Sequence, residues 1–283
     1  MKILKNVILF FLLIILWQGF TTVSISTSKS ILDKMIAATK DIKNLRYNLH
    51  SIERVNNKFL AANTEIKMIV EPCKIYLKNP KKKLEVLFID GENNNKAMVN
   101  TGKFILPVLH LNPNEALMRK EQHHTLGDLG FNYFINIISK NVSHTNSSFD
   151  DTFIYLGIEE YHGRKCHKIY YKNKDFKYFD YTIQKNETIR SISNKFSCGD
   201  YRIHEKNPSL SLTENLKEGT VISVPNGYGI NTLLYIDTIL NLPAGIITSD
   251  DMGLYESYIF SDIIVNSPFA KEEFDKNYKG YNF

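Results

Sequence analysis

The clearest structural pattern in the sequence is the alternation over residues 60–70, which read LAANTEIKMIV. Leu60, Ile66, Met68 and Val70 share one set of alternate positions, and mostly polar side chains fill the other set. Successive side chains of a strand point to opposite faces of a sheet, so this pattern predicts a strand with one buried face.

Segments with a similar pattern lie on both sides of this strand. We predict further strands over residues 45–49, 73–78, 84–89, 96–100, 152–160, 165–172, 231–238, 244–248 and 254–265. Turn-forming pairs such as Asn56-Asn57 and Asp90-Gly91 separate consecutive segments closely. Short connections of this kind favour antiparallel pairing.

Two helices are expected beside these strands. Residues 31–38 have amphipathic spacing, and apolar residues recur at helical spacing from Leu126 to Ile138. Thr125, with Asp128 three residues later, resembles a capping box at the start of the second helix. We therefore expect an α+β fold in which helices cover an open antiparallel sheet.

The N-terminal segment has the order of a secretory signal peptide. Lys2 and Lys5 precede an apolar run over residues 7–17, and the small residues Ser24 and Ser26 follow. This run is shorter than the roughly 18 apolar residues of a membrane-spanning helix. We expect residues 1–26 to be removed and the mature chain to reside in the periplasm or exported cell envelope. The alternative is an uncleaved membrane anchor.

Composition narrows the class of protein. The chain has 283 residues, of which 43% are hydrophobic and 23% charged, as in an ordinary globular protein. Its formal charge of +5 falls to +3 without Lys2 and Lys5, which is too mild to indicate nucleic acid as a partner. Cys73, Cys166 and Cys198 lack metal-ligand spacing, and we expect buried free thiols and no metal or other cofactor.

Residues 181–225 follow a different pattern, in the order strand, helix, helix, strand. Tyr181 begins a short strand, Thr188 is placed to cap the first helix, and Pro208 follows the second helix. Ile189, Ile192, Phe196 and Ile203 fall on the inner faces of the two helices. The segment therefore predicts a small βααβ unit with its own core, inserted at a hairpin of the larger sheet.

This segment resembles the LysM module. The matching residues are Tyr181, Thr182, Glu187, Thr188, Ile189, Ile192, Phe196, Ile203, Asn207, Pro208, Leu216, Gly219, Val221, Val224 and Pro225. Two positions depart from the family pattern, because Asn186 stands where glycine is usual and Arg190 where an aromatic residue is frequent. Asn tolerates a positive φ and can replace that glycine.

The LysM resemblance implies binding of peptidoglycan or a related polymer of N-acetylglucosamine. The expected groove lies between two loops, formed by Asn186, Glu187, Thr188, Ile189, Asn207, Pro208, Ser209 and Leu210. Backbone groups at two helix termini would bind the acetamido group, and Ile189 or Leu210 would contact its methyl. The alternative is a module kept only for packing or for contact with another protein.

The remaining chain resembles an uncharacterised exported family close to the LolA-like superfamily of periplasmic lipoprotein carriers. The resemblance covers most of residues 30–180 and 230–283, and it is strongest at 119–124, 127–130 and 76–78. It implies a curved, open antiparallel sheet, a half-barrel whose concave side can hold a lipid or the acyl chains of a lipoprotein. The predicted lining is Tyr47, Leu49, Ile66, Met68, Val70, Val86 and Phe88. These side chains could equally form an ordinary core.

His123 and His124, with Glu121 and Asp128 nearby, form the densest group of candidate acid–base or metal-binding residues. The spacing of the two histidines is not that of metal ligands on one helix face, and we expect a structural role for them. No nucleotide-binding or hydrolase motif occurs in the sequence, so we expect no enzymatic activity. An envelope hydrolase using these histidines is the alternative.

Together these patterns predict a signal peptide over residues 1–26, a discontinuous LolA-like domain over 27–180 and 226–283, and a LysM domain over 181–225. The expected function is non-catalytic binding of peptidoglycan, with a lipid or lipoprotein as a second ligand. A periplasmic lipid-binding or envelope-assembly factor with a purely structural insert is the alternative.

Overall fold

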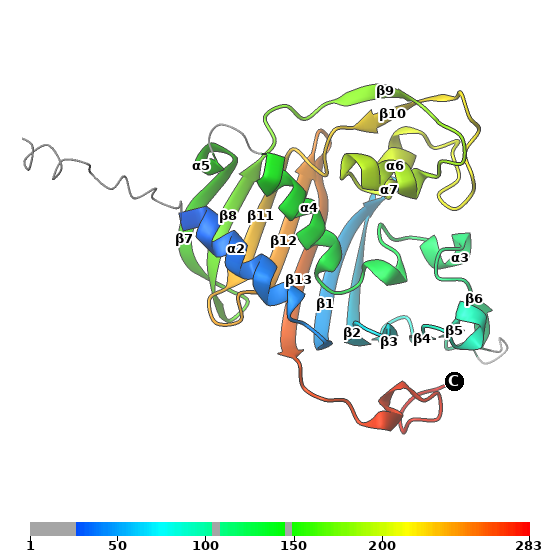
Figure 1. Ribbon diagram of the computed structural model, residues 1–283. Coiled ribbons are helices and arrows are strands. Elements are labelled where there is room, and N and C mark those ends of the chain that lie inside the picture. The colour runs from blue at the N-terminus through cyan, green and yellow to red at the C-terminus, as the bar shows by residue number, and fades with distance from the viewer. Residues whose placement is uncertain (1–26, 104–107, 145–148) are drawn as a thin grey trace, which may run out of the picture.

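A single antiparallel sheet of eleven strands forms most of the molecule (Figure 1). The computed structural model describes residues 27–103, 108–144 and 149–283, so the predicted signal peptide lies outside the described residues. The strands are β1 (Asn44–Val55), β2 (Lys58–Ile69), β3 (Lys74–Asn79), β4 (Leu84–Ile89), β5 (Ala97–Asn100), β6 (Leu109–Leu111), β7 (Phe153–Tyr161), β8 (Arg164–Lys172), β11 (Asn231–Asp237), β12 (Pro243–Asp250) and β13 (Gly253–Val265). The order across the sheet is β6-β5-β4-β3-β2-β1-β13-β12-β11-β8-β7.

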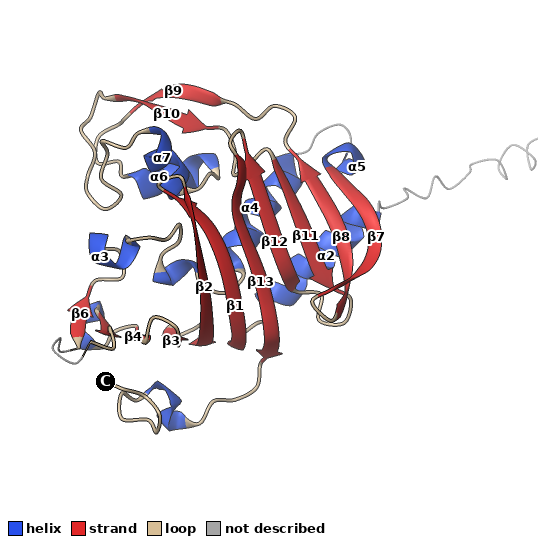
Figure 2. Cartoon of the chain, turned by 180° about the vertical axis from the view of Figure 1, so that it is seen from behind, coloured by secondary structure: helices blue, strands red, loops and turns tan. Residues whose placement is uncertain are grey.

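Helices cover one face of this curved sheet. They are α2 (Thr27–Lys40), α3 (Ala116–Arg119), α4 (Asn132–His144) and α5 (Phe149–Thr152), with a 3-10 turn at η2 (Leu126–Asp128). Two further 3-10 turns are η1 (Asn93–Asn95), between β4 and β5, and η3 (Lys271–Phe274), which packs on the opposite face. Figures 1 and 2, seen from opposite sides, place α2 and α4 across the half of the sheet that runs from β13 to β7. The half that runs from β1 to β6 has shorter helical cover, in which α3 is labelled.

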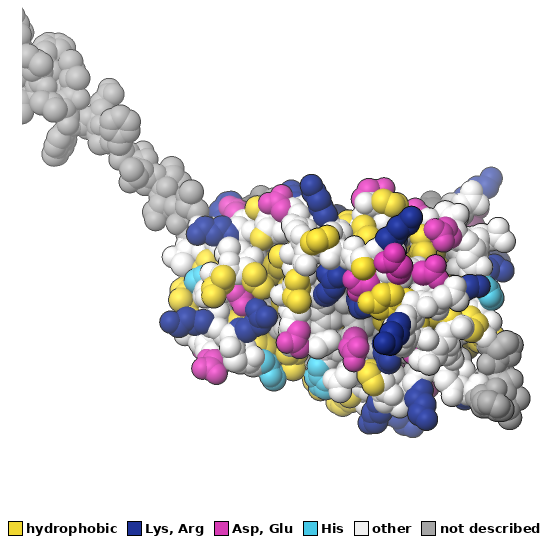
Figure 3. Space-filling view, turned by 90° about the horizontal axis from the view of Figure 1, so that it is seen from below, with side chains coloured by type: hydrophobic (Ala, Val, Ile, Leu, Met, Phe, Trp, Pro, Cys, Tyr) yellow, Lys and Arg dark blue, Asp and Glu magenta, His cyan; other side chains and the backbone are white. Residues whose placement is uncertain are grey.

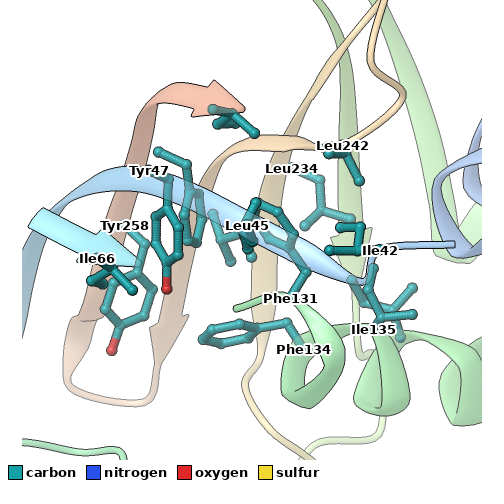
Figure 4. Packing of buried hydrophobic residues seen from close by; sticks show 14 of the residues in the cluster. Ile42, Leu45, Tyr47, Ile66, Phe131, Phe134, Ile135, Leu234, Leu242 and Tyr258 are labelled. Carbon is teal, nitrogen blue, oxygen red and sulfur yellow. The ribbon is translucent and has the colours of Figure 1, made fainter. Parts of the chain in front are cut away.

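The core lies between the sheet and these helices. Figure 4 shows strand residues such as Leu45 and Leu234 facing Phe131, Phe134 and Ile135 at the start of α4. Apolar residues at alternate strand positions meet the apolar face of an amphipathic helix here, as expected from their spacing. The prediction of a mostly antiparallel sheet covered by helices is confirmed.

The predicted capping box caps a different element. Thr125 and Asp128 bond to each other, with 2.8 Å from Thr125 N to Asp128 Oδ2, but they enclose only the 3-10 turn η2. Gly130 follows with φ of +83°, so the helical path breaks and α4 begins at Asn132. The helix expected over residues 125–138 is therefore two elements.

Residues 178–225 form a βααβ unit at one end of the sheet (Figure 1). It consists of β9 (Tyr178–Thr182), α6 (Ile189–Phe196), α7 (Asp200–Lys206) and β10 (Val221–Pro225), and its strands pair antiparallel. Its small separate core contains Ile189, Ile192 and Ile203. The unit lies between β8 and β11 in the chain, yet these two strands pair directly with each other. It is therefore carried on the connection between two neighbouring strands.

The outer surface mixes charges of both signs. Lys and Arg side chains are interspersed with Asp and Glu on the face shown in Figure 3.

Near the C-terminus, Glu273 bonds Arg46 and Lys67, and Tyr281 stacks on Tyr76 with 3.7 Å between ring centroids. The C-terminal segment thus packs on the face of β3 and β4 that looks away from the helices.

Two of the three cysteines are buried, and all three are free thiols. Cys166 and Cys198 are buried and Cys73 is partly buried. Burial raises the pKa of Cys198 to about 12, so this thiol stays protonated at neutral pH.

Candidate functional site: a cavity with an apolar end and a polar end

A row of apolar side chains crosses the helix-covered face of five strands. Strand register places Tyr47 opposite Ile66, Ile66 opposite Leu77, Leu77 opposite Val86, and Val86 opposite Val99. Because residues that pair directly lie side by side on one face, these side chains form a continuous apolar strip. We call these five residues the apolar row.

The same face becomes more polar further along the strands. Leu49 lies between Phe260 and Thr64, and the next inward position of β1 is Ser51, opposite Tyr258. One step further, Glu53 lies opposite Glu256. Along β1 and β13 this face therefore changes from apolar side chains to hydroxyl and carboxylate groups, whereas β2 places Ala62 and Leu60 beside Ser51 and Glu53.

A cavity of about 470 Å³ opens over this face. Most residues of the segment 117–130, although not Arg119, His123 or Gly127, and Phe134 of α4 line its other side. The volume lies within the roughly 300–1,000 Å³ typical of small-molecule sites, and most lining residues are apolar. The apolar row and residues such as Leu49 and Phe260 line one region, and Glu53, its strand partner Leu60, His124 and Asp128 also contribute.

Buried hydrogen bonds fix the polar end of the cavity. Glu256, which is fully buried, accepts hydrogen bonds from His123 Nδ1 at 2.9 Å, His124 Nε2 at 3.4 Å and Tyr228 Oη at 2.6 Å. Tyr258 Oη, whose single proton is shared with Glu53, lies 3.1 Å from Glu256 Oε2. Burial alone would raise the pKa of Glu256, but the two histidines outweigh this effect and hold that pKa well below its usual range. The carboxylate is therefore ionised at neutral pH.

The two histidines have different surroundings. His123 is buried, stacks between Tyr201 and Tyr255, and does not line the cavity. His124 lines the cavity. Burial lowers the pKa of His124, but the hydrogen bond and charge of Glu256 outweigh burial and raise that pKa to about 9. His124 is consequently a cation at neutral pH.

Ion pairs join the βααβ unit to the cavity wall. Arg119 of α3 binds Asp200 of α7 through two hydrogen bonds of 3.1 Å. Arg190 of α6 donates to Asp128 Oδ2 at 2.5 Å and to Thr125 Oγ1 at 2.9 Å. The segment that lines the cavity opposite the sheet is thus held by two charged contacts from the unit.

A second buried group anchors the unit to the sheet itself. Asp250 of β12 accepts hydrogen bonds from Arg202 of α7 at 2.5 Å and from Arg54 of β1. Arg54 also bonds Glu205 of α7 at 3.1 Å. The side chains of Asp250 and Arg202 are 1% and 0% exposed, so water does not screen this pair.

The structure brings four of the seven predicted lipid-lining residues to the cavity. These are Tyr47, Leu49, Ile66 and Val86. Met68, Val70 and Phe88 pack in the main core instead. Met68 lies under Gly130, whose substitution by a larger residue would place a Cβ 3.1 Å from the Met68 sulfur, so the covering loop closes over that part of the sheet.

The predicted glycan-binding residues fall into two groups. Asn186, Pro208 and Ser209 are exposed, and Asn186 has φ of +62°, in the left-handed region that favours glycine. Glu187, Thr188, Asn207 and Leu210 are half-buried.

Several of these side chains hold the unit together. Glu187 accepts from Tyr181 Oη at 2.8 Å, and Thr188 caps α6. The Asn207 side-chain amide bonds Ile203 O at 2.7 Å and both backbone groups of Ser223.

The expectation that Ile189 contacts a sugar methyl is wrong for this conformation. Its side chain is fully buried in the core of the unit, because its position in the first turn of α6 faces Ile192 and Ile203. Arg190, the second departure from the family pattern, faces the larger domain and forms the ion pair with Asp128. Its place in the sequence is explained by that contact.

The sequence did not single out several residues of this site. Glu53 and Glu256 occupy inward strand positions where an apolar residue would be ordinary, and this is the signal that could have marked them.

Among the described residues, no group of three His, Cys, Asp or Glu side chains is placed to hold a metal ion. Within the same residues, no helix has the length and apolar character to cross a membrane.

Residues 42–189, more than half of the sequence, match the family described as "Protein of unknown function (DUF1571)", and the chain belongs to this family. The match extends from the start of the sheet to the first residue of α6. No curated protein matches the chain.

Solved structures similar to this chain include LolA-like proteins and lipoproteins. A chain of the Pseudomonas aeruginosa MucA/MucB complex matches at 13% identity and a TM-score of 0.41, covering 88% of this chain and 60% of that one. Mycobacterium tuberculosis lipoprotein LppX matches at 11% identity and a TM-score of 0.41, and the match covers 85% of this chain and 96% of LppX. A LolA superfamily protein from Nitrosomonas europaea matches at 9% identity and a TM-score of 0.32, and the match covers 88% of this chain and 97% of that protein. The chain thus spans less than two thirds of the MucA/MucB chain.

Proposed function

We propose that this protein binds one lipid-like amphiphile in the cavity, acts without catalysis, and works in the periplasm or exported cell envelope. The observation that carries the proposal is the cavity of about 470 Å³, which has an apolar row at one end and hydrogen-bonding groups at the other. An amphiphile has the same division between chain and head.

The energetics of chain burial support this ligand class. Each methylene removed from water contributes about 0.8 kcal/mol. A chain of roughly ten methylenes along the apolar row would therefore contribute about 8 kcal/mol before the cost of ordering the ligand. An acyl chain of a lipoprotein would fit the same description as a free lipid.

Filling the cavity tests this proposal. Ala62 lines the cavity on β2, opposite Ser51, so Ala62→Trp should place an indole in the ligand's space. We expect this variant to bind a fluorescent fatty-acid probe at least about tenfold more weakly than the parent chain. Titration of the probe into purified protein measures the change.

Asn63→Trp is the matched control, because Asn63 is exposed on the opposite face of the same strand. It should leave probe affinity unchanged. Full affinity in Ala62→Trp, or no probe binding by the parent chain, would contradict the cavity proposal.

A second proposed function belongs to the βααβ unit, which we infer is a LysM domain over residues 181–225 that binds peptidoglycan or a related N-acetylglucosamine polymer. The larger domain would then comprise 27–180 and 226–283. The exposed loop positions Asn186, Pro208 and Ser209, and the positive φ of Asn186, support this inference. The Arg190 side chain is paired with Asp128, so contacts to a sugar would come from the loops at 186–189 and 207–210.

Sedimentation with purified peptidoglycan tests the second function. Asn207 is unsuitable for substitution because its amide holds the unit together, whereas Ser209 is exposed between the loops. We expect Ser209→Trp to reduce the fraction of protein that sediments several-fold, since an indole there would obstruct the groove. Val221→Trp, at an exposed position on β10, should sediment like the parent chain. Equal sedimentation of both variants would indicate a purely structural insert.

The alternative of an envelope hydrolase rests on His123, His124 and Asp128. In the structure His123 is stacked between two tyrosines, and Asp128 is bonded by Arg190 and Thr125. Structural contacts thus engage two of the three groups, which supports the non-catalytic proposal.

A further inference from the structure

His124 lies where the apolar lining of the cavity gives way to charged groups. Its ring packs edge-on against Tyr133 and Phe134, with centroid distances of 4.9 and 5.2 Å. Its Nε2 faces Glu256 Oε2 at 3.4 Å and Tyr228 Oη at 3.3 Å. The imidazole is thereby fixed in orientation by one nitrogen.

The second ring nitrogen of His124, Nδ1, has no hydrogen-bond partner within the described part of the chain. The side chain nevertheless retains 15% of its surface and lines the cavity. A protonated imidazole carries an N–H on each nitrogen. The ring therefore offers one unused donor that bears positive charge.

The carboxylates around His124 already have their own donors. Glu53 accepts from Tyr258 Oη at 2.5 Å and from His123 N at 2.9 Å. Asp128 is bonded by Arg190 and Thr125, as described above. Glu256 accepts from His123, His124 and Tyr228, and it shares the Tyr258 proton with Glu53. None of the three requires His124 Nδ1 as a partner.

The charged side chains that line the cavity balance in sign. They are His124, Lys82 and Lys120 on the positive side and Glu53, Glu121 and Asp128 on the negative side. A ligand anion therefore meets no net negative lining, and the donor on His124 decides which head group is favoured.

We propose that the ligand of the cavity is a fatty acid or other carboxylate-bearing amphiphile, and that His124 Nδ1–H binds its carboxylate while its chain follows the apolar row. This inference rests on the proposed lipid-binding function and adds the chemistry of the head group. A charge-assisted hydrogen bond shielded from water is stronger than a neutral one, and it discriminates between an anion and a neutral head.

The pH dependence follows from the surroundings of His124. The groups that face it are Glu256 and Tyr258 of β13, Glu53 of β1, Asp128 of η2, Tyr133 of α4, Tyr228 before β11, and the adjacent His123. Burial raises the pKa of Tyr133, Tyr228 and Tyr258 well above 10, so these phenols stay neutral. His124 itself loses its charge as the pH rises through about 9. Carboxylate binding should weaken over that interval.

Three probes with the same chain separate the contributions of head and tail. Dodecanoate, dodecanol and dodecylamine are titrated in competition with a fluorescent probe at about pH 7 and about pH 10. We expect dodecanoate to bind about tenfold or more tightly than the other two at the lower pH. Its advantage over dodecanol should shrink at the higher pH.

His124→Gln should remove the advantage of dodecanoate and leave dodecanol binding within about twofold, which also shows that the variant is folded. His50→Gln is the control, because His50 is a half-buried residue on the other face of β1, away from the cavity, and is bonded to Asn63. Equal binding of dodecanoate and dodecanol, or His124→Gln with undiminished dodecanoate affinity, overturns this inference alone. Failure of all three probes to bind overturns the proposed lipid-binding function instead.

Discussion

Asp250→Asn is expected to lower the free energy of unfolding by about 3–5 kcal/mol, the largest effect of any single change considered for this protein. The Asp250 carboxylate is the shared partner of two guanidinium groups, and Arg202 and Arg54 are 0% and 4% exposed. An amide at this position would leave two buried cations with Glu205 as their remaining anion. Urea denaturation followed by circular dichroism measures the loss.

The neighbouring residue provides a matched control. Asp251 binds Lys206 at 2.9 Å, but the Lys206 and Asp251 side chains are 28% and 40% exposed to water. Asp251→Asn should therefore change stability by less than about 1 kcal/mol. If the two variants were equally stable, the buried ionic group would contribute nothing to holding the βααβ unit on the sheet.

Glu256→Gln is expected to lower the free energy of unfolding by several kcal/mol. It should also change how that free energy depends on pH, which is the more specific test. The pKa of His124 is about 9 in the folded chain and about 6.5 when unfolded, so its contribution is complete below about pH 6.5 and is lost as the pH rises to about 9. Because Glu256 causes this shift, the variant should lose much less stability over the same interval. Unfolding measured between about pH 6 and pH 9 tests the difference.

The stabilising contribution of Glu256 itself is lost at low pH, whereas that of His124 is lost at high pH. Its pKa is depressed in the folded state, so its contribution is present above the ordinary glutamate pKa and is lost as the pH falls below that value. Glu159→Gln, which removes an exposed partner of Lys168, should retain the parent pH profile. A Glu256→Gln profile identical to the parent between pH 6 and 9 would contradict the role assigned to Glu256.

Local pattern predicted the sheet well because its strands have one covered and one open face. The alternation around Ile66 and Met68 reports that asymmetry directly, and β2 is observed over Lys58–Ile69. By contrast, β6 has three residues, too few for an alternation to be recognised. The capping signal at Thr125 was real, but Gly130 with its positive φ ended the helical path that the spacing alone suggested.

The βααβ unit could be predicted in outline because its two helices and two strands are adjacent in sequence. The error at Ile189 arose within that prediction, since a residue on the inner face of α6 cannot also face a ligand. The cavity could be predicted only in part. Its polar end joins residues as distant as Glu53, His124 and Glu256, and no local spacing connects positions separated by so much chain.

The charged contacts that hold the βααβ unit also restrict how the chain can be redesigned. Asn173 N and Ile230 O lie 2.8 Å apart, so a short loop could join β8 to β11 and dispense with everything between them. Such a deletion would remove Asp200, the buried partner of Arg119, and would leave Asp250 and Arg54 paired only with each other, without Arg202 and Glu205. Transplanting or removing the insert would therefore require a compensating substitution in the host, and lineages of this family that lack it should carry an uncharged residue at position 119.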